Sequence, residues 1–210
     1  MTAMDAERLG EELRHMDADG KRAWVDRLAA DGSPGAIDRL IAALEQESWY
    51  VRDQATRALG ALGDAAVDRL LGMLESGLWY TRAAAAGALG RTGLPVTAAP
   101  LTDMLRDSNR TVRDAARDAL VALARQELAA HAVATAFIEL PERAQRFALD
   151  GIAERDAAIA AGVARLMADP ARRAAAESAL EASSLARAMG DDEQDLHWED
   201  VVGDRRESNG

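Results

Sequence analysis

The sequence predicts an all-α protein, an α-solenoid of about five to six stacked helix pairs followed by a disordered acidic tail. One segment of the chain repeats itself at an offset of 30 residues. Within each copy the apolar residues recur at helical spacing, as in the pair Leu40 and Leu44, and no strand-like alternation accompanies them. A single helix pair cannot bury its apolar stripe alone. Stacking of successive pairs supplies the missing partner surface.

The repeat is clearest between residues 40–63 and 70–93. The residues that recur are Leu40, Leu44, Trp49, Tyr50, Arg52, Ala55, Ala58, Leu59, Gly60 and Gly63, found again 30 positions later. A third copy, shifted by a further 31 residues, keeps Leu101, Leu105, Arg113, Ala116, Ala119 and Leu120. In that copy Arg110 and Thr111 replace the Trp-Tyr pair. More distant copies of the same frame extend the array in both directions.

We expect helix pairs over residues 5–32, 34–63, 64–93, 95–125, 126–153 and 156–186, and the tail over 189–210. The first unit is degenerate and caps the array. Ser33 precedes Pro34, as an N-cap residue precedes a proline at the first helical position. Gly63 and Gly93 are placed to end the second helices, and Asp64 is placed to cap the helix that follows.

These motifs resemble a known family. The frame Leu-x3-Leu, followed by Trp-Tyr-Val-Arg-x2-Ala-x2-Ala-Leu-Gly-x2-Gly at residues 49–63, is similar to HEAT repeats. Its short period is most similar to the bacterial HEAT-like class first associated with phycobilisome lyase subunits. The resemblance covers residues 35–125 well and, with degeneration, about 5–185. It implies a stacked helical array that serves as a scaffold, adaptor or inhibitor and only occasionally as part of an enzyme. The site must therefore be argued from the surface.

Two repeated features allow a structural and a functional interpretation. The arginines at 52, 82, 113 and 173 either brace turns and neighbouring units or form a basic ladder for an acidic ligand. We favour the brace, because the resemblance implies pairing with acidic groups and turn carbonyls. Trp49 and Trp79, each followed by Tyr, either close the turn between two helices or form an exposed binding hot spot.

The second helix of each unit has a face opposite its buried stripe. If Val51, Ala55 and Leu59 are buried, the opposite face carries Asp53, Thr56, Arg57 and Gly60. The resemblance implies that this face lines the concave side and binds the partner. The equivalent residues of the other copies are Ala83, Ala86, Gly87 and Gly90, and then Asp114, Arg117, Asp118 and Val121. The uncharged middle set suits a close-packing partner, although alanine is also the best helix former.

The net charge of -11 is concentrated near the C-terminus. Residues 189–210 hold eight acidic and two basic residues, whereas the remaining 188 residues hold 28 and 23. Such a composition predicts disorder. Within it, Leu196, Trp198 and Val201 form an apolar cluster that is typical of a short linear motif. This cluster either docks into an apolar groove of another protein or folds back on this chain.

Chemistry-bearing motifs are missing from the sequence. It has no Cys, its three His have no metal-binding or catalytic spacing, and it lacks phosphate-binding and nucleophile motifs. We therefore expect no enzyme activity, cofactor or metal. The acidic charge speaks against nucleic acid as a partner, and no apolar run is long enough to span a membrane. With an acidic N-terminus, the chain is expected to be cytoplasmic.

The leading hypothesis is a non-catalytic scaffold or adaptor that binds a protein or peptide through its second-helix face. The alternatives are a subunit of a tetrapyrrole lyase-type or other enzyme complex, and a nucleic-acid-binding HEAT-like protein. The sequence does not indicate the identity of the partner or whether the array self-associates.

Overall fold

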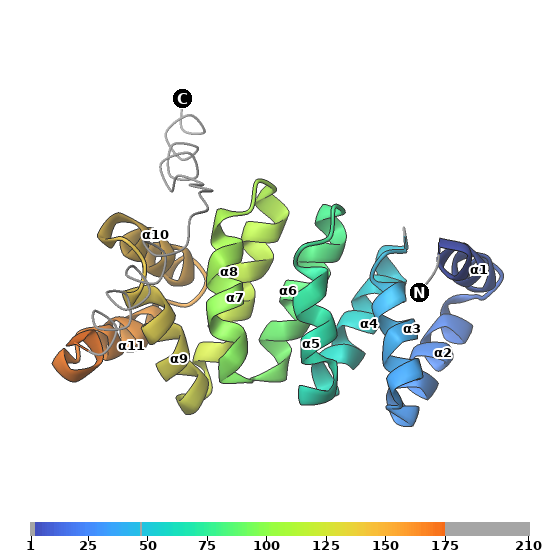
Figure 1. The fold of residues 1–210 in the computed structure, drawn as a ribbon, viewed down its shortest axis with the longest axis horizontal. Helices are drawn as coiled ribbons and strands as arrows, with labels where there is room; N and C mark the ends of the chain where they lie inside the picture. Colours follow the sequence, from blue (N-terminus) through green and yellow to red (C-terminus); the bar gives the residue numbers. More distant parts are fainter. Residues whose placement is uncertain (1–2, 47, 175–210) are drawn as a thin grey trace, which may run out of the picture.

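The computed structural model describes residues 3–46 and 48–174, and throughout these ranges the chain is α-helical apart from turns and short 3-10 segments. The expected all-α solenoid is confirmed. Figure 1 shows the helices standing side by side in chain order along the long axis of the molecule. The first helices of successive pairs are α1 (Ala3–Arg14), α3 (Pro34–Ala43), α5 (Asp64–Met73), α7 (Ala98–Asp103), α9 (Glu127–Ile138) and α11 (Ala157–Met167).

Each of the first five pairs is completed by a second helix. These are α2 (Ala18–Asp31), α4 (Trp49–Ala61), α6 (Trp79–Thr92), α8 (Arg110–Ala124) and α10 (Glu142–Ala153). Residues 170–174 are again helical. Helix α7 is short, with 3-10 segments at Pro95–Thr97 and Met104–Arg106 on either side of it. Pro95 is the first residue of its 3-10 segment and Pro100 lies in the first turn of α7, positions where a missing N–H costs no helical hydrogen bond.

The helix ends follow the punctuation of the sequence with one exception. The Ser33 hydroxyl accepts a hydrogen bond from Ala36 N at 3.2 Å and caps α3. Gly63 and Gly93 follow α4 and α6 with φ values of 58° and 71°, which glycine adopts without steric strain. Asp64 is not the cap of α5 but its first residue, so its carboxylate acts on the positive end of the helix instead.

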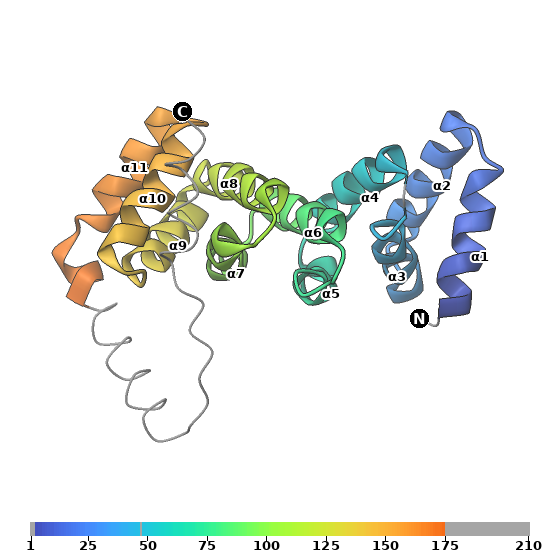
Figure 2. The same ribbon diagram turned by 90° about the horizontal axis from the view of Figure 1, so that it is seen from above.

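The core lies between the two helices of each unit and between neighbouring units. Equivalent residues are buried alike: Leu40, Leu70 and Leu101 are all inaccessible to solvent, as are Ala55, Ala85 and Ala116. Figure 2 shows that the middle of the array forms an arc, with α4, α6 and α8 on the inner side and α5 and α7 on the outer side. The turns that enter α4, α6 and α8 all lie along one edge, the upper edge in Figure 1.

Candidate partner-binding surface

The repeated arginines brace the turns between the two helices of a unit. Each guanidinium donates to the carbonyl six residues earlier in the chain. Arg82 Nη1 lies 2.8 Å from Ser76 O, Arg113 Nη1 lies 2.8 Å from Asp107 O, and Arg173 Nε lies 2.8 Å from Met167 O. Arg52 makes the same bond to Gln46 O. The brace interpretation is therefore correct, since these carbonyls at the ends of the first helices need partners.

One brace also reaches the next unit. The Arg82 guanidinium pairs with the Asp107 carboxylate in a two-bond arrangement at 2.7 and 3.0 Å. This hydrogen bonding raises the pKa of Arg82 above its ordinary value. Both side chains are largely buried. Arg82 is thus a structural residue, because its guanidinium bonds Ser76 O on one side and the Asp107 carboxylate on the other.

Two of the four uncharged residues of α6 that were predicted to face a partner are buried inside the array. Ala86 is inaccessible to solvent and Gly90 is buried. A Cβ atom added at Gly90 would lie 2.5 Å from Ala119 Cα on α8. The expectation that Ala86 and Gly90 contact a partner is therefore wrong. Only Ala83 and Gly87 keep partial exposure.

The physical reason is the close approach of consecutive second helices. A Cβ atom at Gly60 of α4 would lie 2.5 Å from Arg91 Cβ on α6 and 3.1 Å from Ala88 O. Helix α6 therefore packs against its own first helix α5 and against the second helices α4 and α8 on both sides. Small residues let the backbones meet at this crossing.

The charged residues on the predicted binding face of α8 are also bonded to other residues of the same chain. Arg155, which follows α10, donates to Asp118 at 2.7 Å and to Asp114 at 3.1 Å. Arg117 donates to Asp114 at 2.9 Å and lies over the Phe147 ring at 5.3 Å. Only 9% of Arg117 is exposed, so the expectation that it meets a partner is wrong. Asp114 and Asp118 brace α8 against the following unit.

On α4 the corresponding charges remain accessible. Asp53 and Arg57 form an ion pair at 2.8 Å one helical turn apart, and 58% of the Arg57 side chain is exposed. A pair of this kind is worth little to folding. These two residues, with Ala83 and Gly87, are the part of the predicted second-helix face that a partner can reach.

The Trp-Tyr pairs divide between packing and exposure. Tyr80 is half-buried, its hydroxyl donates to Glu45 O at 3.4 Å, and the Arg52 guanidinium lies 4.6 Å from its ring centre. The tyrosine therefore closes the turn against the preceding unit. The tryptophans do not: 70% of Trp49 and 45% of Trp79 are exposed. The turn-closing interpretation therefore holds for Tyr80, whereas the binding hot spot at Trp49 and Trp79 stays a prediction for two exposed rings.

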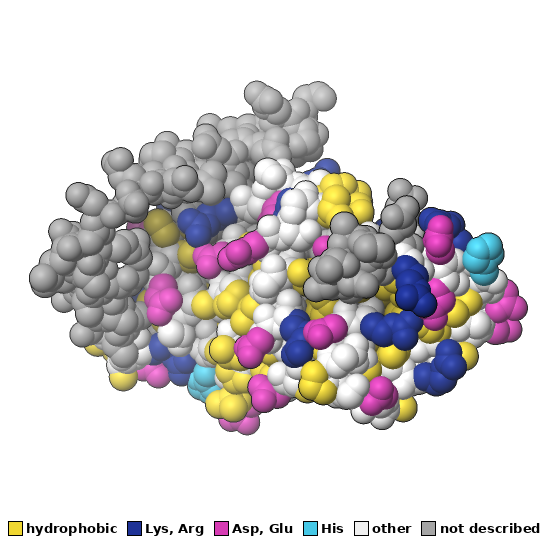
Figure 3. All heavy atoms as spheres, turned by 45° about the vertical axis from the view of Figure 1, so that its right-hand side comes forward, with side chains coloured by type: hydrophobic (Ala, Val, Ile, Leu, Met, Phe, Trp, Pro, Cys, Tyr) yellow, Lys and Arg dark blue, Asp and Glu magenta, His cyan; other side chains and the backbone are white. Residues whose placement is uncertain are grey.

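Leu78 extends this exposed apolar surface and was missed by the sequence reasoning. It precedes α6 and is 41% exposed. We call Trp49, Leu78 and Trp79 the aromatic edge. A signal was present in the repeat, because the equivalent residues before α4 and α8 are Ser48 and Asn109, both ordinary N-cap residues. Figure 3, in which the N-terminal end of the array comes forward, shows charged side chains of both signs interspersed over this face. Hydrophobic side chains reach its upper edge.

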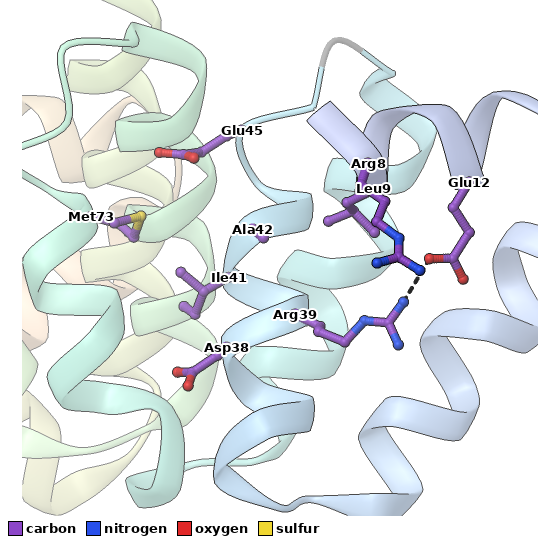
Figure 4. A pocket seen from close by; sticks show the side chains of 9 residues that line it. All are labelled: Arg8, Leu9, Glu12, Asp38, Arg39, Ile41, Ala42, Glu45 and Met73. Carbon is purple, nitrogen blue, oxygen red and sulfur yellow. Dashed lines mark hydrogen bonds and ion pairs between the residues drawn. The ribbon is translucent and has the colours of Figure 1, made fainter. Parts of the chain in front are cut away.

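A broad hollow lies on the first-helix side, between α1, α3 and α5. It has a volume of about 1080 Å³, and its lining mixes apolar side chains such as Leu9, Ile41 and Met73 with charged ones. Figure 4 shows Arg8, Glu12 and Arg39 together at one side of it and Met73 and Glu45 at the other. Glu12 and Arg39 form an ion pair at 2.7 Å. No sequence motif pointed to this hollow, since its residues come from three helices.

Comparison with known proteins decides the family. The sequence profile described as HEAT repeats matches residues 6–78 and 64–121, which is more than half of the chain. The chain belongs to the HEAT-repeat family. The resemblance seen in the repeated motif is thereby confirmed, and the family is one of repeat scaffolds for protein interaction.

Other comparisons add little to the HEAT assignment. The chain is similar to a crystal structure titled as an engineered protein, with 20% sequence identity and a TM-score of 0.37. The match covers 86% of this chain and 96% of that chain. At this TM-score the likeness carries no argument. No curated protein matches the chain.

Two expectations about the HEAT array concern residues at its limits. Leu196, Trp198 and Val201 lie outside the described residues, as does the end of the sixth expected unit.

Within residues 3–46 and 48–174, no helix is both long and apolar enough to cross a membrane, and no cluster of His, Asp or Glu has metal-binding geometry.

Proposed function

We propose that this HEAT-repeat protein is a non-catalytic scaffold or adaptor that binds a protein or peptide partner in the cytoplasm. One observation carries the proposal: three large apolar side chains, Trp49, Leu78 and Trp79, are exposed together along one edge of the array. Exposed aromatic residues of this kind are the usual anchors of protein interfaces.

The neighbouring residues support this choice of surface. Arg82 and Tyr80 of α6, and Asp114, Arg117 and Asp118 of α8, are committed to contacts within the chain, as described above. Trp79 meets Tyr80 edge to face, with ring centres 5.7 Å apart. A ring held in this way loses little conformational entropy when a partner covers it. The accessible part of the inner face, with Asp53, Arg57, Ala83 and Gly87, adjoins the edge through α4 and α6.

Site-directed cross-linking tests the proposal. A photo-activated amino acid at position 78, carried by the full-length chain in the source cells, should capture one partner reproducibly. The Trp49→Ala, Trp79→Ala double variant should abolish that capture without a loss of helicity or a large change in melting temperature, since both rings are exposed.

The matched control is Leu128→Ala. Leu128 is 72% exposed but lies on α9, away from the aromatic edge. This variant should capture the partner like the parent chain. Equal loss of capture in the control and the double variant, or undiminished capture in the double variant, would contradict the proposed function.

A further inference from the structure

One arginine fastens the last helical segment that the structure describes to the fifth unit. Arg172 lies in the segment 170–174, which follows α11 at the end of the array shown on the left of Figure 2. Its Nη1 atom donates to His131 O on α9 at 3.0 Å and lies 3.5 Å from Thr135 Oγ1. Its Nη2 atom lies 2.5 Å from Nδ1 of the His131 imidazole. The guanidinium thus joins residues that are 41 positions apart in the chain.

The other hydrogen bonds of this segment are local. Arg173 Nε donates to Met167 O at 2.8 Å, and the Asp169 carboxylate accepts a hydrogen bond from Ala171 N at 3.0 Å. These bonds order the turn after α11 but do not reach another unit. Within the part of the chain that the structure describes, the hydrogen bonds that tie this segment to α9 are therefore those of Arg172.

The contact with the imidazole requires a neutral His131. A guanidinium keeps its protons in a protein and can only donate hydrogen bonds. Nδ1 of His131 must therefore accept the bond from Arg172, so the ring carries its single proton on Nε2. A second proton would occupy Nδ1 and would place one cation directly against another. The hydrogen bond would then be replaced by repulsion.

Burial makes this conflict costly. Both His131 and Arg172 are half-buried, where solvent and salt screen like charges less than at an open surface. Arg172 Nε is inaccessible to solvent and has no hydrogen-bond partner among the described residues. A guanidinium that also loses its bond to Nδ1 has more unpaired donors, which water satisfies only away from α9.

Apart from Arg172, the charged groups around α9 make no contact with the His131 ring. Among the residues that the structure describes, no carboxylate pairs with this ring. Glu127 lies one turn earlier on α9 itself. Arg165 is the one charged residue of α11 and is exposed, and the 3-10 segment Pro95–Thr97, which also packs on α9, has none.

The charged residues of α7, α8 and α10, which complete the surroundings of α9, are engaged elsewhere. Arg113 braces its own turn, and Arg143 and Asp150 have other interactions. The remaining pairs are Asp103 with Arg106, Arg110 and Arg117 with Asp114, Asp118 with Arg155, Arg125 with Asp156, and Glu142 with Arg146. Arg172 is therefore the group that a proton added to Nδ1 would meet.

We infer that His131 and Arg172 form a pH-sensitive latch at the C-terminal end of the array. While His131 is neutral, the segment 170–174 is docked on α9. Protonation of His131 releases the segment and uncovers the α9 surface around Thr135. The docked state is thus favoured at high pH and is lost as the pH falls. Histidine ordinarily changes charge between about pH 5 and 8, so mild acid opens the latch.

The latch goes beyond the proposed function, because it concerns α9 and not the aromatic edge. It gives the array two forms that differ at one end only. In the open form, α9 offers a surface that Arg172 covers in the closed form. Binding of a partner at the aromatic edge can succeed or fail without any effect on this inference.

Paramagnetic broadening of amide signals tests the latch on the full-length protein. The chain has no Cys, so Leu128→Cys carries a single nitroxide label on α9, three positions before His131. Leu128 is 72% exposed, so the label should leave the packing intact. The label should broaden the signals of Ala171 and Arg173 at about pH 8, and this broadening should be lost at about pH 5. The signals of α11, which packs on α9, should stay broadened at both values.

Variants of the two partners separate the latch from other effects of acid. In His131→Asn a neutral Oδ1 takes the place of Nδ1, so the segment should stay docked at both pH values. His131→Lys is charged at both values and should leave the segment undocked. Arg172→Met removes the repelling charge, so any docking that remains should no longer respond to pH. His15→Asn, at the other end of the array, should respond like the parent chain.

Three results would overturn the inference. Broadening that persists while the His131 ring signals titrate would mean that the imidazole turns away and Arg172 stays. An acid-induced loss of broadening that persists in His131→Asn would place the titrating group elsewhere, for example at Asp169. Nitrogen chemical shifts that show a proton on Nδ1 at about pH 8 would exclude the hydrogen bond from Arg172.

Discussion

The Arg82 guanidinium joins two units of the array through Asp107. Its Nε and Nη2 atoms donate to the carboxylate at 2.7 and 3.0 Å, while Nη1 donates to Ser76 O in its own turn. The same carboxylate accepts a hydrogen bond from Asn109 N at 2.7 Å. One side chain therefore fixes its own turn and the next. This pair therefore joins the two units in addition to the packing of α6 on α8.

Asp107→Asn should destabilise the protein. The change leaves the Arg82 guanidinium without its counter-charge at a largely buried position. We expect a loss of about 2–3 kcal/mol in the free energy of unfolding, near the lower limit for breaking a buried ion pair. Urea denaturation followed by circular dichroism measures it. Asp53→Asn is the control, since its pair with Arg57 is exposed, and it should cost less than about 1 kcal/mol. Equal losses would refute the assigned role of Asp107.

Gly90→Ala and Gly87→Ala should have opposite effects on stability. At position 90 the new methyl group would meet Ala119 Cα and Cβ at 2.5 Å, so α6 and α8 would have to separate, at a cost of about 1–3 kcal/mol. At position 87 the nearest atom would be Thr56 Cγ2 at 3.5 Å, an ordinary contact. There the better helix propensity of alanine should add up to about 1 kcal/mol. Thermal melting of both variants decides the point, and a stabilised Gly90→Ala would contradict the close packing.

Gln145 should be replaceable by arginine but not by alanine. It takes the place of the repeated arginine in the fifth unit, where its amide donates to Leu140 O at 2.8 Å and Ile138 O at 3.1 Å. Gln145→Ala leaves these carbonyls without that donor and should cost about 1–2 kcal/mol. Gln145→Arg restores the donor of the other units and should keep the melting temperature near that of the parent. A loss as large as that of the alanine variant would show that the fifth turn differs from the others.

The stability that the Asp156 cap gives to α11 should depend on pH. Asp156 accepts hydrogen bonds from Ile159 N and Ala158 N at 3.1 Å and pairs with Arg125 at 3.4 Å. The bond from Ile159 N is the largest cause of a lowered pKa for this carboxyl, and Arg125 and Ala158 N add to it. A lowered folded-state pKa means that the stabilisation is complete above the ordinary value near 3.8 and is lost as the pH falls through the folded value.

Paired melting curves check this cap. The melting temperature of Asp156→Ala should lie below that of the parent chain at neutral pH, and the gap should narrow as the pH is lowered from about 5 to about 3. Asp156→Asn keeps a neutral capping oxygen, so the difference between the melting temperatures of Asp156→Asn and Asp156→Ala should stay constant over the same range. A gap between parent and Asp156→Ala that does not change with pH would exclude the charged cap.

The fold was predictable because the repeat combines period, apolar spacing and turn residues in one frame. The site was predictable only in part. A helical wheel of α6 treats the helix as if it had one buried side, whereas Gly90 meets Ala119 of α8 and Ala86 is buried as well. Contacts between distant segments were also hidden: Arg155 reaches Asp114 across 41 positions, and no local pattern links them. Trp49 and Trp79 were identified, but only the structure separates their exposure from the packing of their tyrosine neighbours.

The glycine contacts between second helices have a consequence for the shape of the molecule. Where Gly60 and Gly90 bring the inner helices together, each unit becomes a wedge that is thinner on the inner side than on the outer side. Figure 2 shows the array bending toward that same side, with α4, α6 and α8 inside the arc. A single methyl group at such a crossing would therefore straighten the arc and change the spacing of surface residues that it never touches.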